Sequence, residues 1–196
     1  MHVTELRFIE LAKRHALVGM QAAKALNDKQ DQLQLELLLS QERLASPEGT
    51  AQSRAALEQL SEFMHTHQAA FEQLALTCSA ELASALDELP EQLQAEYRAG
   101  VVASINWQLE AQSLLYRNRE RWIAAAMEIC QLIDNCRDAV VFADEGMGFA
   151  NEEDLERFQA LFAIIEEVHQ FEVAQLSERS QRLVQALAVL EQVRPA

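Results

Sequence analysis

The fold of this chain is decided by residues 46–90, which read SPEGTAQSRAALEQLSEFMHTHQAAFEQLALTCSAELASALDELP. Ser46 and Pro47 mark a helix start, because a serine side chain caps free N–H groups and proline fits the first helical position. Apolar or weakly polar residues then recur every three or four positions, the period of an amphipathic helix. They are Leu57, Leu60, Met64, His67, Phe71, Leu74, Cys78 and Leu82. The segment 47–87 is therefore predicted to form one long helix that ends before Pro90.

The same helical period occurs in three other segments, and breaking residues are few. The predicted helices are residues 3–45, 47–87, 91–142 and 152–193, with DEGMGFAN at 144–151 as the last break. Only 5 Gly and 3 Pro occur in 196 residues, which argues against a loop-rich or all-β chain. We therefore predict an all-α domain over residues 1–196, an up-down-up-down bundle of four long antiparallel helices. A coiled-coil dimer is the alternative arrangement.

The net charge of −15 disfavours partners that carry many phosphates, so no nucleic acid is expected. The charge is uneven along the chain. Residues 1–45 carry six basic and six acidic side chains, whereas residues 46–89 carry one and seven, and residues 143–196 carry four and eleven. We expect basic partners to dock on the second and fourth helices. The weakly charged first helix is the expected self-association surface of a homodimer.

The chain has three cysteines, Cys78, Cys130 and Cys136. This number is small and odd, so they do not indicate a disulfide framework. They are interpreted as small apolar residues in a reducing compartment. No stretch of 18 apolar residues occurs, so no membrane insertion is expected, and a cytoplasmic location is predicted. No nucleophile–base pair is recognisable in the sequence, so a non-enzymatic role is favoured.

Two Glu-x-x-His spacings raise the possibility of a metal site. Glu62 and His65 lie in the second predicted helix, and Glu166 and His169 lie in the fourth. Carboxylate-bridged di-iron or di-manganese bundles use this spacing on two helices, and such a site would give redox or oxygen-handling activity. On a helical wheel, however, Glu62 and His65 point away from the apolar stripe, which favours two exposed pairs and no cofactor.

A set of polar residues lies on or beside the apolar stripes. It comprises His67, Gln112, Arg119, Trp122, His169 and Glu172. Folding the helices back at their links places Arg119 at the height of Glu172, and His67 at the height of His169. A buried charge needs a partner, so one interpretation is a buried ion pair between Arg119 and Glu172. The other is a small polar pocket between helices that binds a small ligand.

The first helix contains two short resemblances. Residues 15–19, HALVG, are similar to the phosphorylation motif of histidine phosphotransfer modules, with Val18 in place of the usual lysine. His15 lies on the apolar stripe, so it is interpreted as a core histidine. Residues 9–26 resemble the first helix of bacterial four-helix sensor domains of the PilJ and nitrate-sensor type, with Ala12, Arg14, Ala23 and Lys24 matching.

The sensor resemblance implies a signalling bundle, without nitrate binding because Ala16 stands in the Gln-Arg core of that motif. Together these features predict a non-enzymatic helical protein for signalling or partner binding, with a protein or a small ligand as partner. A di-metal redox bundle is the enzymatic alternative. An adaptor or chaperone for another helical protein is the third interpretation.

Overall fold

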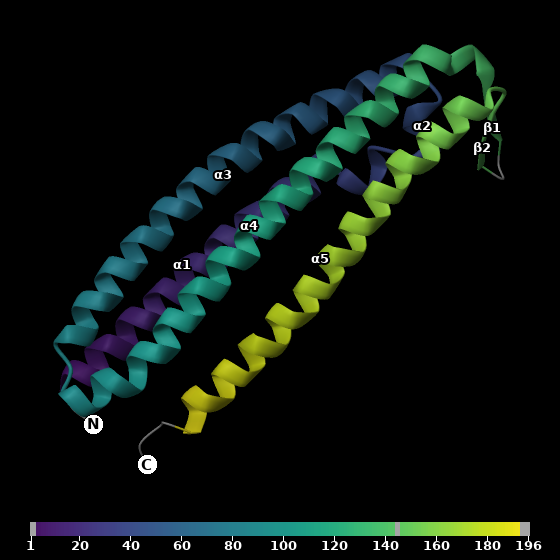
Figure 1. Cartoon of the computed structure of the whole chain (residues 1–196). Coiled ribbons are helices and arrows are strands. Elements are labelled where there is room, and N and C mark those ends of the chain that lie inside the picture. The colour runs from purple at the N-terminus through teal and green to yellow at the C-terminus, as the bar shows by residue number, and fades with distance from the viewer. Residues whose placement is uncertain (1–2, 144–145, 193–196) are drawn as a thin grey trace. The chain divides into compact units, whose positions relative to one another are not determined.

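The structure is a computed structural model that describes residues 3–143 and 146–192. The chain divides into two compact units, residues 1–116 and 117–196, and each is described here by itself. Nearly all described residues are helical, so the all-α prediction is confirmed. The predicted four uninterrupted helices are replaced by several long helices, one short helix and a β-hairpin (Figure 1). Among the described residues, no helix combines the length and apolar character needed to cross a bilayer.

The first unit contains α1 (Val3–Leu33), α2 (Gln41–Leu44), α3 (Pro47–Asp87) and the beginning of α4 (Glu91–Cys136). The predicted helix over residues 3–45 is wrong beyond Leu33. Gln34 adopts the left-handed conformation, with φ 51°, and a 3-10 turn over Leu35–Leu37 follows. The interruption turns the chain so that α2 packs on α3, with Leu38 and Leu44 completely buried.

The prediction for residues 47–87 is confirmed, and its start has the expected chemistry. The Ser46 side chain accepts a hydrogen bond from the backbone N–H of Gly49 at 3.0 Å, and Pro47 is the first helical residue. One turn later, the buried Ser53 hydroxyl donates to the carbonyl of Leu38 at 2.7 Å. The bond gives a partner to the Leu38 carbonyl, which lies outside a regular helix because the chain is interrupted after α1.

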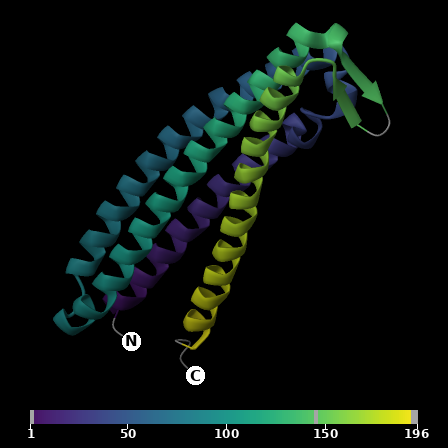
Figure 2. The same cartoon turned by 45° about the vertical axis from the view of Figure 1, so that its right-hand side comes forward.

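An apolar cluster joins α1, α3 and the first part of α4 at the other end of this unit. Its buried members are Phe8, Leu82, Leu86 and Leu89, and Tyr97, Val101 and Ile105 pack against them from α4. The rings of Phe8 and Tyr97 lie 5.3 Å apart between centroids. Figures 1 and 2 both show these three helices running side by side. The predicted apolar stripes therefore form a shared core in the first unit.

The second unit contains the remainder of α4, the strands β1 (Val140–Ala143) and β2 (Gly146–Phe149), and α5 (Glu152–Gln192). The predicted helix over residues 91–142 is wrong after Cys136. The strands pair antiparallel, with Val140 opposite Phe149 (Figure 2). Val140, Val141 and Phe142 favour a strand because branched and aromatic side chains fit a pleated surface.

The hairpin rests on the beginning of α5. The ring of Phe149 in β2 lies 5.2 Å from that of Phe158 in α5, measured between centroids. The α5 helix begins at Glu152 as predicted, and the Asn151 side chain accepts a hydrogen bond from the N–H of Glu153 at 3.0 Å. Residue 193, the predicted end of this helix, lies outside the described residues.

Candidate functional site

Arg119 of α4 and Glu172 of α5 form an ion pair inside the second unit, as one of the two sequence interpretations predicts. The Nη2 atom of Arg119 donates to Oε2 of Glu172 at 2.6 Å, and the two side chains are 8% and 21% exposed. The Arg119 guanidinium lies 5.4 Å from the centre of the buried Trp122 ring. This position over an aromatic face favours the cation. The Arg119–Glu172–Trp122 group is thus held together within one unit.

The ion pair is incompletely satisfied. The Nε atom of Arg119 and the Oε1 atom of Glu172 are buried and have no hydrogen-bond partner in the described part of the chain. Burial lowers the pKa of Arg119, whereas Glu172 opposes this shift. Burial also raises the pKa of Glu172, although Arg119 and His169 oppose the rise. Burial therefore has a larger effect on the pKa of Glu172 than its neighbours have.

The remaining predicted ligand-binding residues lie at different places. His169 is exposed on α5, where its influence on Glu172 is electrostatic. His67 and Gln112 lie in the first unit, on α3 and α4. The Gln112 Oε1 atom is buried without a hydrogen-bond partner among the described residues. A ligand site that uses these residues remains a prediction.

His67 links three helices of the first unit. Its Nε2 atom lies 2.9 Å from the carbonyl oxygen of Ala22 in α1, and its Nδ1 atom lies 2.8 Å from the hydroxyl of Tyr116 in α4. A carbonyl only accepts, so Nε2 carries the proton and Nδ1 accepts from Tyr116. His67 is thus a structural link between α1, α3 and α4.

We expect the Tyr116→Phe substitution to lower the free energy of unfolding by about 1–2 kcal/mol, because it leaves a ring nitrogen of His67 without its donor. Tyr116 is 4% exposed, so water cannot readily replace the hydroxyl. The other tyrosine, Tyr97, is half-buried and donates to Glu5 at 3.0 Å. Tyr97→Phe is therefore a matched control with a smaller expected loss. Urea unfolding measures both, and equal losses would contradict the prediction.

The predicted metal ligands are exposed on two helices. Glu62 and His65 lie on α3 of the first unit, and Glu166 and His169 lie on α5 of the second. Within residues 3–143 and 146–192, no group of three or more His, Cys, Asp or Glu side chains is arranged to hold a metal ion. No observation therefore favours the di-metal interpretation.

A second cluster lies between α1 and α3 in the first unit and was not foreseen as a site. The Sγ atom of Cys78 lies 2.8 Å from Nδ1 of His15. The Nε2 atom of the same ring lies 2.9 Å from Oε2 of Glu81, and this carboxylate also accepts from Nη2 of Arg14 at 2.8 Å. The structure thus places a thiol beside a histidine ring nitrogen, a contact that was not predicted from the sequence, and His15 is a bridge between a thiol and a carboxylate.

The tautomer of His15 follows from its neighbours. Glu81 favours the proton on Nε2, since an ionised carboxylate only accepts, and this leaves the lone pair of Nδ1 facing Cys78. The Nε2 atom lies 2.9 Å from Oε2 of Glu81 but makes no hydrogen bond of ordinary geometry, so the carboxylate acts on the ring through its charge. The two ring nitrogens face different partners, and the three side chains do not form a metal-holding group among the described residues.

The sequence contains a signal for this cluster. His15 and Cys78 both lie on predicted apolar stripes, and each is 31 residues from the break at Ser46–Pro47. Folding the two predicted helices back at this break would place these residues at the same height. The count is only an approximate guide, because α1 ends at Leu33 and the chain between Leu33 and Ser46 is not one helix.

The α1 helix carries a second feature, on the side opposite its core. We name as the α1 outer stripe the exposed residues Val3, Leu6, Glu10, Lys13, Leu17 and Met20. Their spacing alternates between three and four, the heptad spacing of a coiled-coil seam. Leu17 is 57% exposed, and Phe8, which lies nine residues away on the opposite side of the helix, is 4% exposed.

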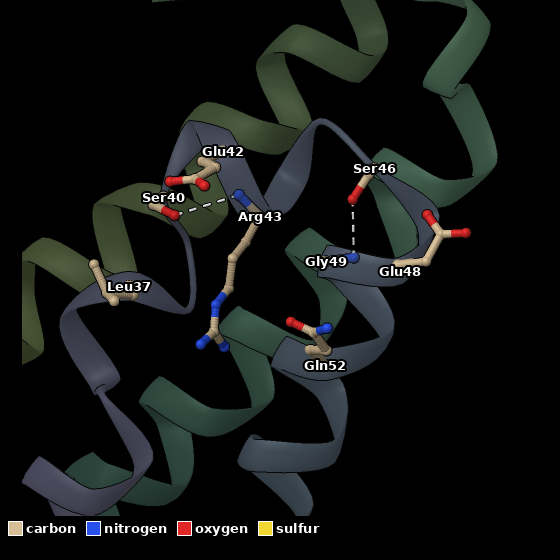
Figure 3. A pocket seen from close by; sticks show the side chains of 8 residues that line it. All are labelled: Leu37, Ser40, Glu42, Arg43, Ser46, Glu48, Gly49 and Gln52. Atoms are coloured by element: carbon tan, nitrogen blue, oxygen red, sulfur yellow. Dashed lines mark hydrogen bonds between the residues drawn. The ribbon is translucent and has the colours of Figure 1, made fainter.

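Two surface pockets in the first unit contain none of the predicted site residues. The first, of about 330 Å³, lies at the corner between α2 and α3 (Figure 3), where Arg43 and Gln52 lie near each other. The second, of about 290 Å³, lies between α3 and α4. The first is bounded by backbone and caps: Ser40 accepts from the N–H of Arg43 at 3.4 Å, and Ser46 caps α3.

Comparisons with protein-family models, with curated proteins and with solved structures find no match to this chain.

Proposed function

We propose that this chain is a non-enzymatic helical protein that acts by binding protein partners, and that its first partner is a second copy of itself docked along α1. The observation that carries this proposal is the α1 outer stripe. Its apolar members are well exposed: Val3 is 67%, Leu6 41%, Leu17 57% and Met20 53% exposed. Four large apolar side chains on one helix face are typical of an interaction surface.

The order of residues along the stripe is self-complementary. If two α1 helices pair antiparallel about a two-fold axis between residues 11 and 12, Val3 lies opposite Met20 of the other copy. Leu6 then lies opposite Leu17, and Glu10 opposite Lys13. Each layer is therefore either apolar against apolar or negative against positive, which is what an isologous interface requires.

Charge selects the antiparallel arrangement over the parallel one. In a parallel pair each residue meets its own copy, so Glu10 faces Glu10 and Lys13 faces Lys13, and like charges in direct opposition are destabilising. Residues 3–20 extend over about 27 Å of helix, enough for five turns of contact. The remainder of α1 and its core face are unaffected, because Phe8 and Leu26 are buried on the opposite side.

A charge-swap cycle tests the proposal. We expect the chain to dimerise reversibly, and either Glu10→Lys or Lys13→Glu to weaken the dimer about tenfold, since each makes two opposed pairs like-charged. The double variant Glu10→Lys/Lys13→Glu restores opposite charges and should restore dimerisation. Both residues are exposed, so the fold should tolerate these changes. Sedimentation equilibrium over a range of protein concentrations gives the dissociation constants.

A second arm tests the apolar layers. Leu17→Glu should abolish the dimer, because it places a carboxylate in both leucine layers at once. Leu76→Glu is the matched control, since Leu76 is a 68% exposed leucine on α3, outside the stripe. A monomeric parent chain, an equal loss in the Leu76 variant, or a double charge swap that fails to restore the dimer would contradict the proposal.

A further inference from the structure

The Cys78–His15–Glu81 cluster has the arrangement of an activated nucleophile. The Sγ atom of Cys78 lies 2.8 Å from Nδ1 of His15, which can accept the thiol proton. Nε2 of the same ring lies 2.9 Å from the carboxylate of Glu81, which orients the ring. This order of groups is the general signature of nucleophile activation. Arg14 donates to the same carboxylate oxygen, Oε2, at 2.8 Å. Nothing in the proposed dimer requires this cluster, because His15 points away from the α1 outer stripe.

The surroundings decide which electrophile fits. Cys78 lies inside α3 (Pro47–Asp87), more than two turns before its end, where the backbone N–H groups are bonded within the helix. No backbone donors are thus available to stabilise the oxyanion of an acyl-transfer reaction. The thiol is half-buried and the His15 side chain is 11% exposed, which leaves access for a small reagent only.

We propose that Cys78 is an oxidative modification site at which hydrogen peroxide, or a small organic hydroperoxide, converts the thiol to a sulfenic acid with His15 as the base. The Nδ1 atom of His15 takes the proton from Sγ, and the sulfur attacks one peroxide oxygen. An S–O bond forms while the O–O bond breaks. The leaving hydroxide or alkoxide takes the proton from His15, so the thiol is oxidised and the peroxide is reduced to water or alcohol.

The electrostatics of the resting state oppose a free thiolate at Cys78, so geometry alone supports the proposed base. Burial and the nearby Glu81 carboxylate raise the pKa of the Cys78 thiol, whereas its backbone hydrogen bond and Arg14 lower it. The thiol therefore keeps its proton at neutral pH, and the reactive thiolate forms only when Nδ1 accepts that proton. Glu81 stabilises the imidazolium that results, as a positioning residue.

The chain contains an internal control for this chemistry. Cys136 is also half-buried, and burial together with Asp154 raises its pKa as well. Its Sγ atom donates to the carbonyl of Leu132 at 3.1 Å, a group that accepts hydrogen bonds and takes no proton at neutral pH. A difference in reactivity between Cys78 and Cys136 therefore measures the effect of His15 in one and the same molecule.

The test exposes the full chain to hydrogen peroxide with a cyclic 1,3-dione that traps sulfenic acids, and follows each cysteine peptide by mass spectrometry. We expect Cys78 to be trapped about 100-fold faster than Cys136, the usual size of a general-base effect. His15→Gln should reduce the rate at Cys78 to that at Cys136, and Glu81→Gln should reduce it less. His67→Gln, which removes another linking histidine of this unit, should leave it unchanged.

The comparison within the parent chain needs no variant, so it decides the proposal even if His15→Gln unfolds. Equal trapping of Cys78 and Cys136 would overturn the proposal. A His15→Gln chain that keeps its far-ultraviolet circular dichroism and still traps Cys78 at the parent rate would also overturn it. If His67→Gln slows the reaction as much as His15→Gln does, the effect is a general loss of packing and the base assignment is wrong.

Discussion

Replacing Glu172 by leucine is expected to lower the free energy of unfolding by about 3–5 kcal/mol, because it leaves the Arg119 guanidinium buried without its counter-ion. Arg119 is 7% exposed as a residue and cannot lose its proton at any ordinary pH. The uncompensated charge has no way to become neutral. The measurement is urea unfolding at neutral pH, followed by circular dichroism.

The reverse substitution, Arg119→Leu, should lower the free energy of unfolding by less, because Glu172 can become neutral by taking a proton. Burial already raises the pKa of Glu172 in the folded chain, and removal of Arg119 raises it further. A folded-state pKa above the unfolded value means that the folded state binds the proton more tightly. The stability of the Arg119→Leu variant relative to the parent therefore increases as the pH falls through this raised pKa.

The double variant Arg119→Leu/Glu172→Leu closes the cycle. We expect it to be close to the parent chain in stability, or somewhat more stable. The reason is that removing both charges from water costs more free energy than their mutual attraction restores. The geometric reason is that Nε of Arg119 and Oε1 of Glu172 are buried without hydrogen-bond partners in the described part of the chain. Two losses that simply add, with no recovery in the double variant, would show that the two side chains do not interact.

The second large effect is expected at Gly49, at the corner between α2 and α3. A methyl group there would lie 2.8 Å from the Cα and carbonyl carbons of Arg43, and closer still to its carbonyl oxygen. These are backbone atoms of α2, so no side-chain rotation relieves the clash. Gly49→Ala should lower the free energy of unfolding by about 3 kcal/mol, the upper part of the range for overpacking.

The control for Gly49 uses the same substitution elsewhere. Gly19 in α1 and Gly100 in α4 have no atom within 4 Å of an added methyl group. Alanine at either position should raise stability by about 0.5–1 kcal/mol, because glycine loses more backbone entropy in a helix. Thermal and urea unfolding should show a loss of stability for Gly49→Ala and a gain for Gly19→Ala or Gly100→Ala. If Gly49→Ala is as stable as the parent chain, α2 does not pack on α3 in this way.

The helix over residues 47–87 shows how far local patterns can be trusted. Its start at Pro47, its end at Asp87 and most of its stripe are as predicted, because capping and period are short-range properties. Residues 34–40 show the opposite outcome. Their leucines are good helix formers, yet the chain leaves the helix at Gln34 so that Leu38 can be buried. Tertiary burial there outweighs intrinsic propensity.

Three leucines in the predicted helices are exposed although they have the apolar character of core residues. Leu37 is 41%, Leu109 40% and Leu176 70% exposed. The spacing of apolar residues identifies one face of a helix. Whether a residue on that face is buried depends on which neighbouring element lies beside it at that position along the helix. The outer stripe of α1 was missed for a related reason, since Glu10 and Lys13 interrupt its apolar pattern. Only exposure values separate this stripe from the core stripe.

The sequence by itself determined the helical class, the starts of α3 and α5, and the pairing of Arg119 with Glu172. These follow from spacing along one helix, or from similar distances to a turn, and both can be counted in the chain. Only the tertiary structure decided that α1 stops at Leu33, that a hairpin follows α4, and that His15 faces a thiol on one side and a carboxylate on the other. The physical reason is that these features depend on contacts between residues far apart in the chain, whose favourable burial exceeds the local preference of each segment.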